Sequence, residues 1–187
     1  MNENMQQNAA RTYLGALSFY HPNTGGNGSA VQFELKPARG NRDGCFFMVM
    51  ARQKTAPTRA ADGMRQAATF DWQNRLTVKL GFNDVCSLLL VLHGRQECVN
   101  NGKGLFHDTP DASTVIQLRR GSDHPGYGLE VSRKAKQNGA EPVRLRLMLT
   151  EAEALGLALV FEQSMLLLAY GTPTPEAMLP GARAPEA

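Results

Sequence analysis

Residues 75–94 read RLTVKLGFNDVCSLLLVLHG. The first part of this stretch alternates apolar and polar residues, which is typical of a strand with one buried face. From residue 85 the apolar positions recur at spacings of three and four, the pattern of an amphipathic helix. The stretch therefore predicts a strand that leads directly into a helix, with Gly81 or Asn83 at its N-cap and Gly94 as a left-handed stop.

A second junction of the same kind lies at residues 143–153, VRLRLMLTEAE. An alternating strand again meets a helix start, where Thr150 and Glu153 form a capping box. The apolar pattern continues to Tyr170 and leaves open whether one helix or two cover it. Strand-like segments separated by Gly, Asn, Pro and Asp clusters precede both junctions. They cover residues 13–21, 30–36, 46–52 and 75–80 before the first helix, and 104–107, 115–119, 127–134 and 143–149 before the second.

The two halves also match in detail. Residues 31–33 correspond to residues 116–118, and both junctions have the same form. Further along, the match pairs Gly44, Cys45, Phe47, Val49, Arg52 and Lys54 with Gly126, Tyr127, Leu129, Val131, Lys134 and Lys136. We therefore predict an α+β protein in which a ββββα unit is used twice, over residues 12–100 and 101–170.

Length and composition set the class of protein. The chain has 187 residues, 42% hydrophobic and 20% charged, which suits a globular domain. No apolar stretch is expected to reach the ~18–20 residues of a membrane span, and residues 1–11 lack a secretory signal, so no membrane partner is expected. Three cysteines without a CxxC pair favour reduced thiols and a cytoplasmic location. Residues 1–11 and the Pro/Ala-rich residues 171–187 are expected to be disordered.

Basic charge is concentrated in the middle of the chain, although the formal net charge is only +3. Residues 36–79 hold nine Lys or Arg against three Asp or Glu, and residues 102–148 hold eight against five. Residues 149–187 hold one against five. This distribution suits a surface that meets a polyanion on one side, and a solvated face without a partner would have the same pattern.

Strand alternation places many of these cations on the outer faces of the sheets. Lys and Arg neutralise phosphates, and an aromatic ring such as that of Trp72 can stack with a base, although a lone Trp can equally anchor the core. The predicted nucleic-acid site comprises Lys36, Arg52, Lys54, Trp72, Arg75, Lys79, Arg119, Lys134, Lys136, Arg144 and Arg146. We expect the cations on strands 75–80 and 143–149 to form one positive track. The alternative is that they pair with Glu34, Glu130 or Asp71 across strands.

The strand at residues 46–52 departs from simple alternation. Phe47 and Val49 fit the inner face, which would place Phe46, Met48 and Met50 on the outer face. There they are predicted to form an oligomer interface or to stack with bases.

No catalytic or metal site is apparent. His21 and His107 occupy matching positions, but no cysteine or carboxylate lies at metal-ligand spacing around them. No nucleophile, base and orienting group come together in the pattern. The glycines of residues 25–28 join two strands and do not open a helix, so no phosphate loop is predicted. We therefore expect a protein that is not an enzyme and has no metal or cofactor.

This arrangement resembles the Whirly family and its relatives in the single-stranded-DNA-binding transcriptional regulator superfamily, which include positive-cofactor-four-like coactivators and kinetoplastid mitochondrial RNA-binding proteins. The likeness covers about residues 12–170. The Whirly motif Lys-Gly-Lys-Ala-Ala-Leu falls nearest residues 27–32, which keep the Gly and one Ala and lack both lysines. The resemblance implies two antiparallel four-stranded sheets packed across each other, helices that hold the core, and a symmetric homo-oligomer, with a tetramer favoured. It also implies weakly sequence-selective binding of single strands along the sheets.

The expected function is therefore binding of single-stranded DNA, with RNA left open as the ligand, in transcription regulation or DNA maintenance. The alternative is a non-enzymatic protein–protein oligomerisation module whose basic face is incidental.

Overall fold

The computed structural model describes residues 15–59, 63–122, 124–137 and 141–171. The ends expected to be disordered lie outside the described residues, apart from Gly171. The first half contains β1 (Leu17–His21), β2 (Ser29–Lys36), β3 (Cys45–Thr55), β4 (Thr58–Arg59), β5 (Arg65–Gln66), β6 (Thr69–Phe70), β7 (Leu76–Leu80) and α1 (Phe82–Leu92). The second half contains the short 3-10 helix η1 (Val99–Gly102), β8 (Leu105–Asp108), β9 (Ala112–Arg120), β10 (Tyr127–Ala135), β11 (Val143–Leu149) and α2 (Glu151–Tyr170).

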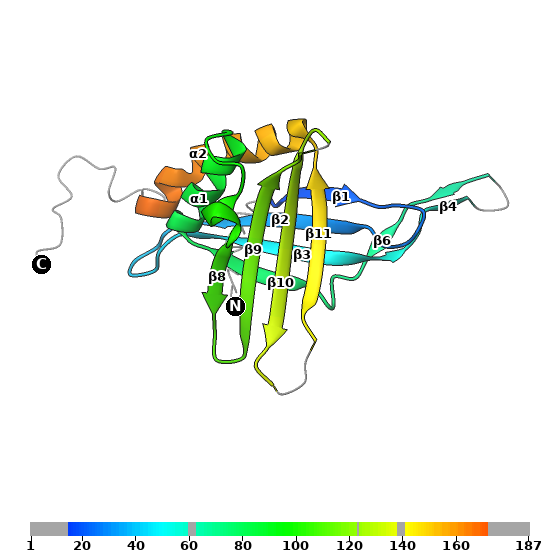
Figure 1. Ribbon diagram of the computed structural model, residues 1–187, viewed down its shortest axis with the longest axis horizontal. Coiled ribbons are helices and arrows are strands. Elements are labelled where there is room, and N and C mark those ends of the chain that lie inside the picture. The colour runs from blue at the N-terminus through cyan, green and yellow to red at the C-terminus, as the bar shows by residue number, and fades with distance from the viewer. Residues whose placement is uncertain (1–14, 60–62, 123, 138–140, 172–187) are drawn as a thin grey trace, which may run out of the picture.

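The strands form two antiparallel sheets that cross each other (Figure 1). In the first sheet β1, β2 and β3 are neighbours in that order, and both β7 and the short β6 pair with β3. The second sheet has the order β8, β9, β10, β11. Each sheet is thus a meander whose last long strand leads into a helix. The α+β class and the crossed sheets are confirmed, whereas the internal duplication stays a prediction.

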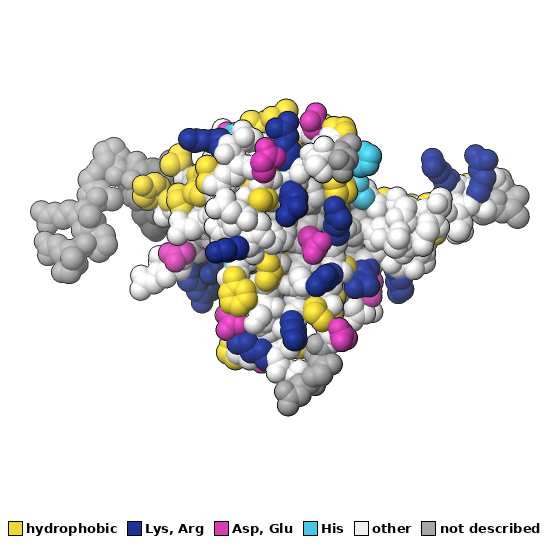
Figure 2. Space-filling model, in the orientation of Figure 1, with side chains coloured by type: hydrophobic (Ala, Val, Ile, Leu, Met, Phe, Trp, Pro, Cys, Tyr) yellow, Lys and Arg dark blue, Asp and Glu magenta, His cyan; other side chains and the backbone are white. Residues whose placement is uncertain are grey.

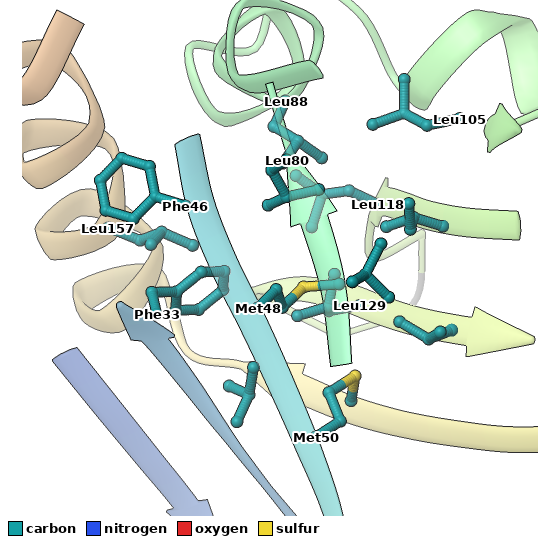
Figure 3. Close-up of a cluster of buried hydrophobic side chains, with 14 of the residues drawn as sticks. Phe33, Phe46, Met48, Met50, Leu80, Leu88, Leu105, Leu118, Leu129 and Leu157 are labelled. Atoms are coloured by element: carbon teal, nitrogen blue, oxygen red, sulfur yellow. The ribbon is translucent and has the colours of Figure 1, made fainter. Parts of the chain in front are cut away.

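The hydrophobic core lies between the inner faces of the two sheets and beneath α2. Phe161 of α2 is fully buried, with its ring centroid 5.6 Å from that of Phe33 and 5.0 Å from that of Phe46. Met48 of the first sheet and Leu129 of the second belong to the same buried cluster (Figure 3). These contacts join both sheets and α2 in one core.

The prediction of which β3 side chains face the core is wrong by one residue. Phe46, Met48 and Met50 are at most 1% exposed and belong to the core. Met48 pairs with Phe33 and Met50 pairs with Val31, both of which are core residues, and cross-strand partners share a face. The three side chains are therefore not available for an oligomer interface or for stacking with bases.

The same shift changes how the two halves correspond. Met48 stands opposite Phe33 as Leu129 stands opposite Leu118, so residue 48 rather than residue 47 corresponds to Leu129. Arg52 then corresponds to Arg133 and not to Lys134. The two arginines also make equivalent contacts between the sheets. Arg52 Nη2 donates to the Arg144 carbonyl at 3.1 Å, and Arg133 Nη2 donates to the Thr77 carbonyl.

Both helix starts are formed as predicted. In α2, Glu153 N–H donates to Thr150 Oγ1 at 3.2 Å and Thr150 N–H donates to Glu153 Oε2 at 2.8 Å. In α1, Gly81 is the N-cap and its N–H donates to Asp84 Oδ2 at 2.9 Å. Gly94 has φ 67°, the left-handed conformation expected at a helix stop.

Helix α2 runs unbroken over 20 residues, which answers the question left open by its pattern. Its mean hydropathy of 1.5 makes it long and apolar enough to cross a membrane by length and composition, contrary to the sequence-based expectation. One face of α2 is a core face, with Leu157, Ala158 and Phe161 buried. Because the helix is apolar around its whole circumference, its sequence does not show which side is inside.

The matched histidines link the two halves reciprocally. His21 on β1 has Nε2 2.9 Å from Glu153 Oε1 on α2, and His107 on β8 has Nε2 3.1 Å from Asp84 Oδ2 on α1. Partial burial acts to raise the pKa of Glu153, but hydrogen bonds from Thr150 and His21 outweigh it, and the net shift is downward. Each histidine therefore joins the first strand of one half to the capping carboxylate of the other half's helix.

Three short strands were not predicted. β4 and β5 pair with each other and form a hairpin that projects from the first sheet (Figure 1). β6 pairs with the end of β3, and the register of this pairing shifts between Gln53 and Thr55. β7 then pairs with residues 46–50 of the same strand. The irregular residues 71–75 between β6 and β7 carry Trp72 and Arg75.

Candidate nucleic-acid interface

The outer face of the second sheet carries a group of exposed cations. Arg144 and Arg146 alternate along β11 with buried leucines, and Arg119 is exposed near the end of β9. Among the described residues, none of these three guanidinium groups forms an ion pair with a carboxylate. Figure 2 shows this face, on which Lys and Arg side chains are spread among a few carboxylates and apolar side chains.

An open depression of ≈ 410 Å³ lies in this face. Its lining combines three arginines, three neutral or acidic polar side chains, one thioether and two glycines. The lining residues are Gln117, Arg119, Arg120, Gly121, Ser122, Gly128, Glu130, Arg146 and Met148. Phe106, on the neighbouring strand β8, is 64% exposed. It lies on the same face, because its cross-strand partner Val115 alternates along β9 in step with Gln117 and Arg119. The face thus offers cations for phosphates beside an aromatic ring.

The outer face of the first sheet holds a second depression, of ≈ 550 Å³. Lys36, Trp72 and Arg75 line it together with Gln32, Glu34, Phe47, Val49 and Thr77. Lys79 extends from the same face, opposite Phe47. This face has fewer free cations than the second sheet, since Lys36 Nζ lies 3.3 Å from Glu34 Oε2.

Three aromatic rings cluster at one end of the first sheet. The ring centroid of Tyr20 is 5.5 Å from that of Phe70 and 6.4 Å from that of Trp72. Tyr20 is 51% exposed, and all three rings border a largely apolar depression of ≈ 480 Å³ with Pro22 and residues 67–69. Trp72 lines this depression as well as the one beside Arg75. An aromatic group with one open side can stack with an unpaired base.

The predicted positive track is divided between two faces. Lys79 lies on the outer face of the first sheet, and Arg75, just before β7, lines the depression in that face. Arg144 and Arg146 lie on the outer face of the second sheet. Because the sheets pack by their inner faces, these two outer faces point to opposite sides of the molecule. One continuous track over both strands is therefore not formed within a single chain.

Several other predicted cations have structural partners. Lys136 Nζ donates to Asp108 Oδ2 at 2.8 Å, and this bond, together with one from Ser113, lowers the pKa of Asp108. Arg52 holds a backbone carbonyl of the second sheet. Lys54 and Lys134 are exposed at strand ends.

The carboxylates considered as alternative partners are mostly engaged elsewhere. Glu34 is paired with Lys36 and not with a cation of the predicted positive track. Hydrogen bonds from Asn74 lower the pKa of Asp71. Glu130 forms no ion pair among the described residues. Cross-strand pairing therefore does not account for Arg75, Arg144 or Arg146.

Some interface residues escaped sequence reasoning. Arg120 borders the depression of the second sheet. It stands opposite the core residue Tyr127, so alternation along β9 alone would place it on the inner face. Tyr20, Phe70 and Phe106 also lie on open faces. The alternation of β1 and β8 places Tyr20 and Phe106 outside and could have identified both. Phe70 lies on a two-residue strand, which has no period to detect.

Metal ligands and reactive thiols would be signs of chemistry beyond binding. No group of three or more His, Cys, Asp or Glu side chains lies together as metal ligands would, within the ranges that the structure covers. All three cysteines are free, and burial raises the pKa of the Cys45 thiol, which keeps it protonated and unreactive.

Neither a family model nor a curated protein matches the chain in sequence. Solved structures do match it in fold. WHY3 from Arabidopsis thaliana superposes with a TM-score of 0.64 at 15% identity, over 85% of this chain and 90% of that one. WHY1 from the same plant gives 0.64 at 16% identity, over 83% and 91%. The chain has the Whirly fold.

A third Whirly-like structure, that of the plant transcriptional regulator PBF-2, has a TM-score of 0.56 at 17% identity, over 82% of this chain and 81% of that one. The Whirly fold accounts for the two crossed meanders and for the position of both helices. At this level of identity the likeness concerns the fold, so the interface is argued from this chain's own residues.

Proposed function

We propose that this protein binds single-stranded DNA, with RNA as a further candidate, along the outer faces of its sheets and with weak sequence selectivity. The observation that carries the proposal is the open face of the second sheet, where Arg119, Arg144 and Arg146 are exposed without carboxylate partners among the described residues. Phosphates are the natural partners of such cations. Transcription regulation or DNA maintenance is the proposed setting, in keeping with PBF-2, whose structure is that of a transcriptional regulator.

Duplex DNA fits this surface less well. Duplex readers commonly place a basic helix in the major groove. Neither α1 nor α2 contains a single Lys or Arg. A flat sheet with aromatic rings suits unpaired bases, which can lie against the rings while their phosphates meet the arginines. The proposed function is binding without a catalytic step.

Trp72 is the single tryptophan of the chain and reports on the aromatic cluster. If bases stack there, titration with oligo-dT should quench its fluorescence and saturate, because a stacked base changes the environment of the indole directly. The matched titration uses a polyphosphate of similar charge, which has no bases and should cause little quenching. Oligo-dT binding without any change in Trp72 emission would remove the aromatic cluster from the interface.

We also propose that the protein is a homo-oligomer, a tetramer if it follows the resemblance, and that α2 forms its interface. Leu155, Leu159, Leu166 and Tyr170 are 62%, 51%, 69% and 83% exposed. At 100° per residue they fall within one narrow stripe of the helix. Yellow side chains gather over α2 at the upper edge of Figure 2. A stripe of large apolar side chains on a helix is the kind of surface that a second copy covers, at ~25 cal/mol per Å² buried.

Light scattering at tens of micromolar is expected to give a mass of several chains, and Leu159→Glu combined with Leu166→Glu is expected to give a monomer. Val143→Glu, which adds the same kind of charge at an exposed strand position, should leave the mass unchanged. A monomeric wild-type protein would contradict the proposal. If that monomer also floats with lipid vesicles, the stripe faces lipid instead of a second copy.

A further inference from the structure

The depression on the second sheet contains a carboxylate in an otherwise cationic surface. Glu130, on the central strand β10, stands opposite Gln117 on β9 and Arg146 on β11. Its side chain is half-buried and forms no ion pair with any described residue within 4.0 Å. A carboxylate repels phosphates, so its place in the middle of a phosphate-binding face calls for another partner.

Gln117, the cross-strand partner of Glu130 on β9, has its amide turned toward another part of the chain. Gln117 Nε2 donates to the Gly102 carbonyl at 2.9 Å, and this bond fixes the orientation of the amide. The reversed orientation would place two acceptor oxygens against each other. Gln117 Oε1 is left buried and without a hydrogen bond in the described structure. The amide is held at the Gly102 turn with its oxygen shielded, so the Glu130 carboxylate is the acceptor that this depression presents to the N–H groups of a ligand.

The floor of the depression is free of side chains at Gly128. A Cβ built at this position would lie 3.5 Å from Met148 Sδ and 3.6 Å from Arg146 Nη2, in ordinary contact with both. With hydrogen in that place, a flat ring can approach the sheet beside the Met148 thioether. Arg119 and Arg120 line the same depression and supply cations for the phosphates of the nucleotide.

Resting on the proposed binding of single strands, we propose that this depression is a guanine-selective subsite. The site offers the Glu130 carboxylate for the edge of a base. Guanine presents the donors N1–H and N2–H₂ side by side, so one carboxylate can accept both. Cytosine and adenine each offer an amino group next to a ring acceptor. Thymine and uracil offer a single N–H flanked by two carbonyls, which a carboxylate repels.

The size of the preference follows from the value of a bidentate contact to a base. Such a pair contributes about 1–3 kcal/mol of discrimination, and the lower half of that range corresponds to about tenfold in affinity. A site that is open to water belongs to this lower half. The preference therefore remains compatible with weak overall sequence selectivity.

The test uses oligo-dT of one fixed length and two variants with a single central substitution, one carrying deoxyguanosine and one carrying deoxyinosine, which lacks the 2-amino group. Affinities are measured by fluorescence anisotropy with the full chain. We expect the guanine oligonucleotide to bind about tenfold more tightly than plain oligo-dT, with the inosine oligonucleotide between them. Glu130→Gln should bring the ratio of guanine to thymine affinities close to one, because the amide replaces one acceptor oxygen by a donor.

Glu151→Gln provides the matched control, since it removes one carboxylate at an exposed position of α2 outside the sheet faces and should keep the tenfold ratio. Gly128→Val, which fills the floor and retains all charges, should abolish the ratio as Glu130→Gln does. Thermal unfolding of each variant shows that it is folded. Equal affinity for all three oligonucleotides, or a ratio that survives Glu130→Gln, would overturn the subsite while leaving single-strand binding in place. Failure to bind any of the three would overturn the proposed function itself.

Discussion

Replacing Phe161 by alanine is expected to lower the free energy of unfolding by about 3–5 kcal/mol, the range for a large aromatic side chain in a core. Phe161 is the fully buried side chain through which α2 contacts Phe33 on β2 and Phe46 on β3. Alanine would leave a cavity at the point where the helix, the first sheet and the core meet. Denaturant unfolding at constant protein concentration measures the loss, because association also contributes to apparent stability.

Two further variants make the test specific. Leu155→Ala on the same helix, at a 62% exposed position, should change the free energy of unfolding far less than Phe161→Ala in a monomeric background such as the α2 double variant. Met48→Ala should cost about 2–5 kcal/mol, because Met48 is completely buried. If Met48→Ala lowered the free energy of unfolding by less than about 1 kcal/mol and also changed the oligomeric mass, Met48 would belong to an oligomer interface, as its sequence suggested, and not to the core.

Removing the two arginines of β11 is expected to weaken binding of oligo-dT strongly. For single strands, each phosphate contact contributes about 0.7 to the slope of log K against log salt concentration. Arg144→Ala with Arg146→Ala should therefore flatten the slope by about 1.4 and reduce affinity roughly 25-fold at 0.1 M salt. The fold should remain intact, because both side chains are exposed and the contact of Arg146 Nη2 with Met148 Sδ, at 3.7 Å, is weak.

The control removes the same amount of charge elsewhere. Arg39 and Arg42 are exposed in the turn between β2 and β3, where their backbones pair with each other away from the sheet faces. Arg39→Ala with Arg42→Ala should weaken binding only through the change in net charge, and much less than the β11 variant. If the two double variants lose affinity equally, the arginines of β11 are not a local site.

The strand-to-helix junctions could be predicted because their signals are local. Leu76, Val78 and Leu80 alternate without interruption, and the Thr150–Glu153 capping box is complete within four residues. Both features depend on neighbouring positions in the chain, so they survive in the folded protein as the sequence suggests. The outward positions of Arg144 and Arg146 followed from the same alternation.

The errors arose where the deciding contacts are distant in sequence. Residues 45–51 of β3 are apolar at every position, so their alternation carries no information about which side is inside. Pairing with Phe33 and Val78 decides that Met48 is buried. In the same way, only the packing of the sheets shows that the cations of β7 and β11 lie on opposite sides, and only the crossing of the two halves brings His21 to Glu153.

The central claim is that an open sheet face binds single strands through their phosphates and bases. The most direct measurement compares fluorescently labelled oligo-dT with a duplex of equal length, by anisotropy, at two salt concentrations. We expect tight binding of oligo-dT at the lower salt, a steep loss at the higher salt, and weaker binding of the duplex under both conditions. No binding of oligo-dT at the lower salt, or binding of the duplex that equals or exceeds it, would contradict the account.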